Sequence, residues 1–149
     1  YYAGDVRRIN HFLKVYGFAK AIGEMEGLDE STQEIIEIAA LTHDIGIKNS
    51  EKKYNSSAGN YQQIEGPPEA KKLLAELGIE SNVIDRVCWL IAHHHTYTDI
   101  QGIDYQILVE ADFLVNFYED DMSIDSVHSA GGKMFKTLSG KAILNAIYS

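Results

Sequence analysis

The chain has 149 residues, of which 45% are hydrophobic, and this content predicts one sizeable core and a single domain over residues 1–149. The formal net charge of −9 argues against a protein that binds nucleic-acid polymers or membrane surfaces, because both partners favour a basic face. The single cysteine, Cys88, and the lack of an apolar stretch as long as a membrane span predict a cytoplasmic protein.

The hydrophobic pattern is helical nearly throughout, which predicts an all-α fold. The first helix is expected over about residues 5–26, with Gly27 as its natural stop. A capping box formed by Ser31 and Glu34 is expected to start the second helix, which ends near Gly46. This second helix is apolar on nearly all sides, so we expect it to lie at the centre of the fold.

The segment 47–61 is polar, so we expect a long loop there, and long loops are often functional. A third helix is predicted to begin between residues 62 and 68 and to stop at Gly78. Because proline is tolerated in a first helical turn, the pair Pro67 and Pro68 is a candidate for its true beginning.

Ser81 is expected to cap a fourth helix that reaches three consecutive histidines, residues 93–95. After a connection over residues 96–103, a fifth helix is predicted over about residues 105–118. One or two shorter helices follow an acidic break at residues 119–121. Glycines are expected to interrupt this last region at Gly131, Gly132 and Gly140.

His43 and Asp44 are adjacent at the end of the apolar second helix. An ionised aspartate is almost never buried without a partner, and that partner is a divalent cation, an arginine or a helix terminus. His11 continues the apolar stripe of its own helix in steps of three and four residues. Taken alone, His11 is more typical of a core histidine than of a metal ligand.

The three histidines differ in helical phase. The inward stripe of their helix, continued in steps of three and four, reaches His94 and His95 and leaves His93 outside. A polar helix end, where histidines interact favourably with the dipole, is the alternative. The stripe consists of Ile84, Val87, Cys88 and Ile91.

Asp112 lies in the apolar segment 107–115, where Glu110 is the other polar residue, so we expect at least one of the two to be buried and paired. Asn116 follows one turn later and is expected to orient Asp112. A structural ion pair is the alternative. Imidazole and carboxylate ligands together suit Fe, Mn, Zn, Co or Ni better than Ca or Mg alone.

The order of His11, then His43-Asp44, then Asp112 resembles the ligand series H…HD…D of the HD-domain superfamily of metal-dependent phosphohydrolases. The resemblance extends over residues 11–112. It implies a phosphodiesterase-like helical bundle with one firm metal site, held by His11, His43, Asp44 and Asp112. It also implies hydrolysis of a small phosphomonoester or phosphodiester, for example a nucleotide, by metal-activated water.

In relatives that hold two metals, a further histidine lies four residues before a glycine that matches Gly66. Gln62 stands at that position here, so a second metal at His94 and His95 is in doubt, and contact with phosphate is their other expected role. Gln62 itself is expected near the metal ligands or the substrate.

The catalytic candidates are Glu65, Asp44 and His94, with Glu65 as a ligand or as a general base. Lys48, displaced by one position from the lysine that follows HDxG in relatives, is a candidate phosphate contact, as are Lys52 and Lys53. Two alternative functions stay open: a di-iron oxygenase of the same superfamily, and a non-catalytic sensor that binds a metal or a nucleotide. The large apolar content of the predicted helices is compatible with a homodimer.

Overall fold

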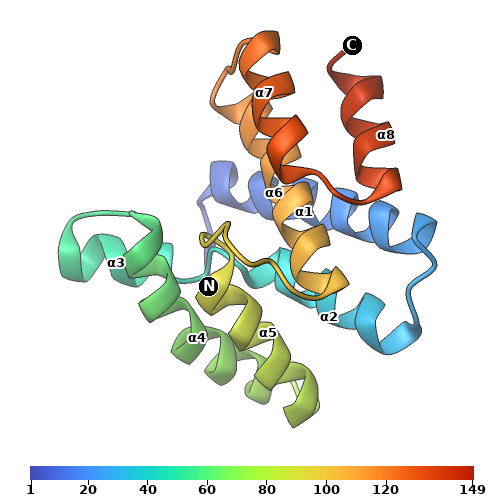
Figure 1. The fold of residues 1–149 in the computed structure, drawn as a ribbon. Coiled ribbons are helices and arrows are strands. Elements are labelled where there is room, and N and C mark those ends of the chain that lie inside the picture. The colour runs from blue at the N-terminus through green and yellow to red at the C-terminus, as the bar shows by residue number, and fades with distance from the viewer.

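The computed structural model describes residues 1–149 as eight α-helices without a strand, which confirms the all-α prediction. Figure 1 shows α1 and α2 across the middle, with α3, α4 and α5 on one side and α7 and α8 on the other. The helices are α1 (Val6–Met25), α2 (Glu30–Thr42), α3 (Ile47–Tyr54), α4 (Gly59–Glu76), α5 (Ser81–His93), α6 (Ile103–Glu119), α7 (Ile124–Met134) and α8 (Leu138–Ile147).

The core is one cluster of 25 buried hydrophobic residues to which every helix except α3 contributes. α2 packs against α1, α5 and α6, as its apolar composition predicts. α6 is buried over most of its circumference, because α1 and α2 cover one side and α7 and α8 pack on others. No helix combines the length and the apolarity that crossing a membrane requires.

The N-terminal caps of two helices differ from the prediction. Asp29, and not Ser31, caps α2, since its carboxylate accepts a hydrogen bond from the Thr32 N–H at 2.7 Å. Gly27, with φ of 71°, ends the preceding turn and brings the chain to Asp29 in an extended conformation. Ser81 is the first residue of α5 and not its cap, because the cap position falls on Glu80.

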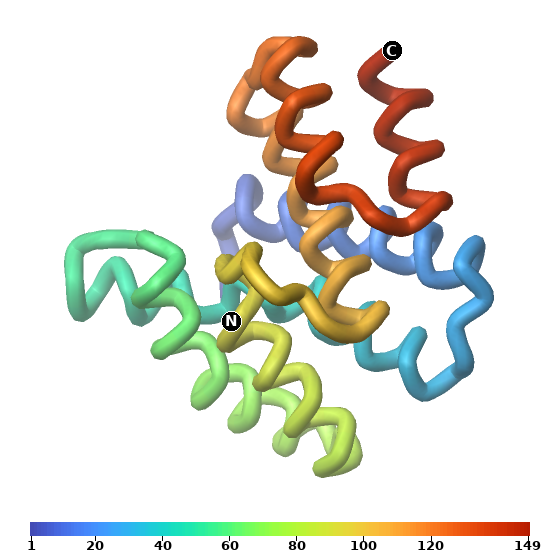
Figure 2. The backbone as a smooth tube through the Cα atoms, in the orientation of Figure 1, coloured from blue at the N-terminus to red at the C-terminus, as the bar shows by residue number.

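The predicted loop over residues 47–61 is wrong. Residues 47–54 form α3, and α4 begins at Gly59, so only residues 55–58 connect them. Figure 2 shows α3 and the start of α4 as an arm that extends to one side of the molecule. α3 buries only Ile47 and Ser50 and is strongly polar, so it lacks the apolar content by which a packed helix is usually recognised.

The prolines and late glycines also lie inside helices. α4 continues through Pro67 and Pro68 instead of beginning there, and the glycines of α7 and α8 do not interrupt them. At Gly131 the missing side chain leaves room for Leu144 of α8, where a Cβ would collide with it. Gly131 therefore serves packing between α7 and α8 and not chain termination.

Gly46 brings the end of α2 close to α4. A Cβ at Gly46 would lie 2.6 Å from the carbonyl oxygen of Gln62 and 2.7 Å from the backbone nitrogen of Gly66. Because both atoms belong to the backbone, neither can move aside without displacing the helix. Glycine at this position thus allows the turn with His43 and Asp44 to pack closely against α4.

Candidate metal centre

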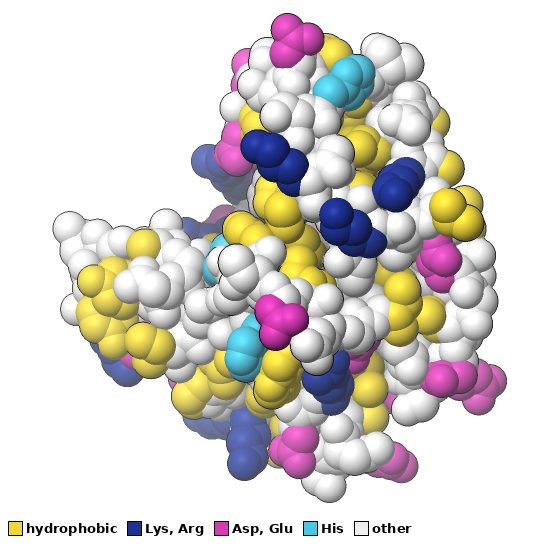
Figure 3. All heavy atoms as spheres, in the orientation of Figure 1, with side chains coloured by type: hydrophobic (Ala, Val, Ile, Leu, Met, Phe, Trp, Pro, Cys, Tyr) yellow, Lys and Arg dark blue, Asp and Glu magenta, His cyan; other side chains and the backbone are white.

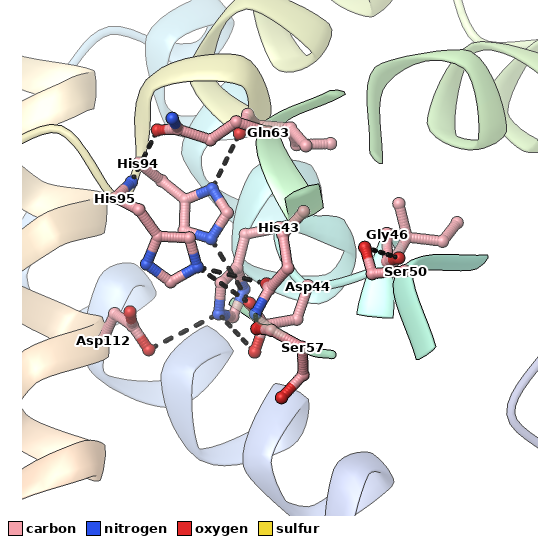
Figure 4. A network of polar contacts seen from close by, with 12 residues as sticks. His43, Asp44, Gly46, Ser50, Ser57, Gln63, His94, His95 and Asp112 are labelled. Carbon is pink, nitrogen blue, oxygen red and sulfur yellow. Dashed lines mark hydrogen bonds and ion pairs between the residues drawn. The ribbon is translucent and has the colours of Figure 1, made fainter. Parts of the chain in front are cut away.

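Four parts of the fold bring the predicted site residues together. His11 comes from α1, His43–Asp44 from the turn after α2, His94–His95 from the end of α5, and Asp112 from α6. Figure 4 shows the side chains of His43, Asp44, His94, His95 and Asp112 directed toward one another. Residues separated by as much as 101 positions in the chain therefore form one polar cluster within the helical core.

Three potential ligand atoms form a nearly equilateral triangle. Nε2 of His11 lies 3.3 Å from Nε2 of His43 and 3.3 Å from Oδ2 of Asp44, and the latter two atoms are 3.5 Å apart. The centre of such a triangle is about 2.0 Å from each corner, close to the roughly 2.0–2.2 Å of zinc bonds to nitrogen and carboxylate oxygen. Oδ1 of Asp112 adjoins the two histidine nitrogens at 3.3 and 3.4 Å.

Backbone carbonyls determine which histidine nitrogen faces this cluster. Nδ1 of His43 donates to the carbonyl of Ala40 at 2.8 Å, and Nδ1 of His94 donates to that of Ile91 at 2.8 Å. A carbonyl oxygen only accepts hydrogen bonds, so the proton is on Nδ1 in both rings. In the neutral rings, the Nε2 lone pairs therefore point toward the carboxylates.

Asp112 supplies a further sign that a cation belongs here. Its Oδ1 atom is buried and has no hydrogen bond of acceptable geometry, although two histidine nitrogens lie at hydrogen-bonding distance. Buried carboxylate oxygens are normally satisfied by donors or by a metal. When the His43 ring is neutral, its Nε2 atom and Oδ1 of Asp112 are both acceptors, and a divalent transition metal satisfies both.

The charges of the cluster perturb its titration strongly. Burial alone would lower the pKa of His11, but the carboxylates of Asp112 and Asp44 raise that pKa to about 10. Burial likewise opposes the charged form of His43, and the carboxylate of Asp44 nevertheless raises its pKa. Against their own burial, the adjoining imidazoles hold the pKa of Asp44 and that of Asp112 below the usual range. In the metal-free protein, protons on the histidines thus balance the negative charge of the carboxylates that would hold a cation.

Glu119 is a site residue that the sequence analysis missed. Nδ1 of His11 donates to Oε2 of Glu119 at 2.9 Å, and Nζ of Lys14 lies 2.7 Å from the other oxygen. Such outer partners fix the ring of a metal-binding histidine. Glu119 follows Asp112 by seven residues, which is two helical turns on one face, so helical phase could have revealed it within the segment interpreted as an acidic break.

Asp44 also contacts the histidines at the end of α5. Its Oδ1 atom lies 3.3 Å from Nε2 of His94 and 3.9 Å from Nε2 of His95. Burial and the nearby His94 lower the pKa of His95 to about 4. His93 points elsewhere, as predicted, and stacks on Trp89 with ring centroids 4.0 Å apart.

Glu65 does not join the ligand cluster. Its two oxygens are occupied by Nζ of Lys53 at 2.8 Å and the hydroxyl of Tyr54 at 3.0 Å, and Lys53 lowers its pKa. These contacts do not support the expected role of Glu65 as a metal ligand, and its role as a general base stays a prediction. The reason is that residues 47–54 form a helix, which directs Lys53 and Tyr54 toward α4.

The structure also corrects two outer residues. Lys48 is exposed and its Nζ contacts the carbonyl of Tyr1 at 3.2 Å, so the expected phosphate contact is not supported. Asn116 makes no hydrogen bond to Asp112 and instead lines a cavity. α6 turns the amide of Asn116 toward the cavity while Asp112 faces the histidines.

A cavity of about 390 Å³ opens beside the cluster. Its wall includes His11 and Asp44, and all but one of its residues are polar or charged. Arg7 and Arg8 supply the positive charge, and Arg8 is paired with Asp5 at 2.9 Å while Arg7 has no ion-pair partner. The other lining residues are Ile47, Glu51, Ser57, Asn116, Glu119 and Asp120.

Comparisons with known proteins show the family of the chain and a solved structure of similar fold. A crystal structure of a predicted HD superfamily hydrolase from an uncultured Thermotogales bacterium has 21% sequence identity and a TM-score of 0.66, over 99% of this chain and 76% of that one. No curated protein matches the chain. The family model of the HD domain matches residues 8–127, a span that includes His11, His43, Asp44 and Asp112. The chain therefore belongs to the HD domain family.

Proposed function

We propose that the protein is a metal-dependent phosphohydrolase that cleaves a small phosphomonoester or phosphodiester, for example in a nucleotide. The observation that carries this proposal is the close approach of potential ligand atoms on His11, His43, Asp44 and Asp112 beside a polar cavity, with Oδ1 of Asp112 lacking a hydrogen bond. The structurally similar protein is a predicted HD superfamily hydrolase, which supports the same class of reaction.

A divalent metal held by these four residues would supply a water of lowered pKa and a Lewis acid for a phosphoryl oxygen. The protein residues then have separate tasks. Burial of His43 and Asp112 keeps bulk water from competing for the ligands. Arg7 is the free cation of the cavity wall and would attract the negative charge of a phosphate.

Substrate size follows from the cavity. A volume near 390 Å³ lies toward the lower end of the roughly 300–1,000 Å³ range of small-molecule sites. The wall is charged and polar and offers few apolar side chains, which favours a small hydrophilic substrate. On the face shown in Figure 3, basic side chains are scattered among uncharged and acidic ones and form no continuous basic patch for a polymer.

The test begins with metal-free protein that is reconstituted separately with Mn, Fe, Co, Ni and Zn. Phosphate release is then measured on a panel of phosphomonoesters, phosphodiesters and nucleotides. We expect activity with at least one metal, and its loss in His43→Ala and Asp44→Ala. The matched control is His128→Ala, since His128 is an exposed histidine on α7 whose ring contacts a backbone carbonyl.

Two outcomes would replace this proposal. Oxygen consumption by the iron-loaded protein without phosphate release would identify an oxygenase. Nucleotide-dependent thermal stabilisation without any product would identify a sensor. A metal-centred function would be contradicted by two results together: the protein binds no divalent metal, and both variants are as stable as the wild type.

A further inference from the structure

We propose that Gln62 excludes His95 from the metal centre, so that the chain binds one divalent cation and not two. The inference rests on the proposed metal-dependent function. It concerns the group of Asp44, His94 and His95, whose potential ligand atoms all lie within 4.8 Å of one another. Judged by distances alone, this group could hold a second cation.

The orientation of the Gln62 amide is set by the backbone. Its Nε2 atom donates to the carbonyl oxygen of Ser57 at 2.6 Å. Because a carbonyl oxygen cannot donate, the NH2 group of Gln62 must face Ser57 and the amide oxygen must face the other way. Gln62 is buried, so water does not offer the amide an alternative partner.

The amide oxygen then determines where the proton of His95 resides. Nε2 of His95 lies 3.1 Å from Oε1 of Gln62, and an amide oxygen only accepts hydrogen bonds. The proton is therefore on Nε2 of His95. A protonated ring nitrogen has no lone pair for a metal, and this same nitrogen is the one that lies 3.9 Å from Asp44.

His94, the neighbouring residue, has the opposite arrangement. Its Nδ1 donates to the carbonyl of Ile91 at 2.8 Å, so the lone pair is on Nε2, 3.3 Å from Asp44. Two adjacent histidines thus present different nitrogen states to one carboxylate. His94 can act as a ligand at that position, whereas His95 cannot.

α4 holds the His95 ring in place. The backbone N–H of His95 donates to Oε1 of Gln63 at 3.1 Å. Gly59 packs against the ring, and a Cβ there would lie 2.8 Å from Cγ of His95. Together with Gln62, these contacts come from one end of α4 and prevent the ring from turning its other nitrogen, which faces the hydroxyl of Tyr97 at 3.5 Å, toward Asp44.

Without His95, a second cation would have too few ligands. Only Oδ1 of Asp44 and Nε2 of His94 remain, and Asp44 already uses its other oxygen toward His11 and His43. Catalytic metal sites in proteins usually have about three protein ligands. Two ligands, one of them shared, fall short of that number.

The first experiment measures metal stoichiometry in the intact protein. Metal-free protein is loaded with excess Mn or Zn, passed through a desalting column and analysed for metal and protein. We expect one equivalent per chain. Two equivalents would overturn the inference and leave the proposed function standing, whereas no bound metal would contradict the proposed function itself.

Variants separate the role of Gln62 from that of His95. His95→Asn should keep one equivalent with an affinity within about threefold of wild type, because the inference gives His95 no bond to the metal. A loss of affinity as large as that of His43→Ala would overturn the inference.

Gln62→His adds an imidazole next to His95 and should raise the metal stoichiometry to two. The control Gln101→His, at an exposed glutamine, should leave the stoichiometry at one. One equivalent in Gln62→His would show that Gln62 is not what excludes the second cation.

Nuclear magnetic resonance provides a readout that needs no metal. Two-bond correlations between ring protons and ring nitrogens identify which nitrogen of each histidine carries the proton. In metal-free protein we expect His95 protonated on Nε2, and a change in this pattern in Gln62→Leu. A His95 ring with its proton on Nδ1 in the wild-type protein would refute the proposed arrangement.

Discussion

Replacement of Glu119 by alanine should weaken metal binding without removing any of the four proposed ligands. The side chain of Glu119 accepts the Nδ1–H of His11 at 2.9 Å and lies mostly buried, with 15% of its side chain exposed. The corresponding partners of His43 and His94 are backbone carbonyls. His11 is thus the histidine of this set whose outer hydrogen bond a substitution can remove.

The expected loss follows from what the carboxylate does for His11. Loss of an outer hydrogen bond to a metal-binding histidine typically weakens metal affinity about 10–100-fold, or roughly 1.4–2.7 kcal/mol. Glu119→Gln keeps an acceptor oxygen but loses the negative charge that Lys14 and His11 share, so its loss should lie at the lower end of this range. Glu119→Ala, with no acceptor, should lie at the upper end.

The assay is competition of metal-free protein with a chromophoric chelator for Zn or Mn, with circular dichroism to show that each variant is folded. Glu24→Ala is the matched control, because Glu24 is an exposed acid near the C-terminal end of α1 that pairs with Lys20 and makes no contact with the cluster residues. An affinity of Glu119→Ala within twofold of wild type would refute the reasoning that this hydrogen bond orients His11.

Three further predictions concern stability and protons. Glu110 is fully buried and accepts hydrogen bonds from the side chain of Gln106 and from the N–H and hydroxyl of Thr137, so Glu110→Ala should cost about 3–5 kcal/mol in urea unfolding. Glu110→Gln should cost less, and equal losses in both variants would argue against the hydrogen bonds as the cause. Gly46→Ala should cost about 1–3 kcal/mol because its Cβ would meet backbone atoms of α4, and an unchanged midpoint would contradict that contact. His11 has a pKa raised from 6.5 to about 10, so its contribution to the stability of the metal-free protein is fully present below pH 6.5 and is lost as the pH rises through about 10. The melting temperature in the presence of a chelator should fall over this interval, and a flat profile would contradict the raised pKa.

Metal binding and proton release are therefore coupled in this centre. A cation must displace the proton that the carboxylates hold on His11, so apparent metal affinity should rise with pH below about 10. This coupling connects the perturbed pKa values with the proposed function, because the same carboxylates attract either a proton or a metal.

Much of the site could be predicted because its residues stand out locally. Helical phase alone placed His94 inward and His93 outward, and the structure shows that arrangement. Asp112 was recognisable as a carboxylate within an apolar helix, and the His43-Asp44 pair as polar residues closing another. Each of these inferences needs only the neighbours along one helix, and helical periodicity is a local property of the chain.

Other features depended on contacts that no local pattern contains. Hydrogen bonding of Glu119 to His11 joins residues 108 positions apart. Pairing of Glu65 with Lys53 followed from α3, a helix with too little apolar content to be recognised. The assignment of the proton on His95 required the position of Gln62 on α4 relative to α5.

The sequence by itself determined the all-helical class and the order of the proposed metal-binding residues, because apolar spacing and residue type are local properties of the chain. Only the tertiary structure decided which nitrogen or oxygen each residue presents. That choice depends on which donors and acceptors of other helices lie within about 3 Å, and hydrogen bonds act only over that distance.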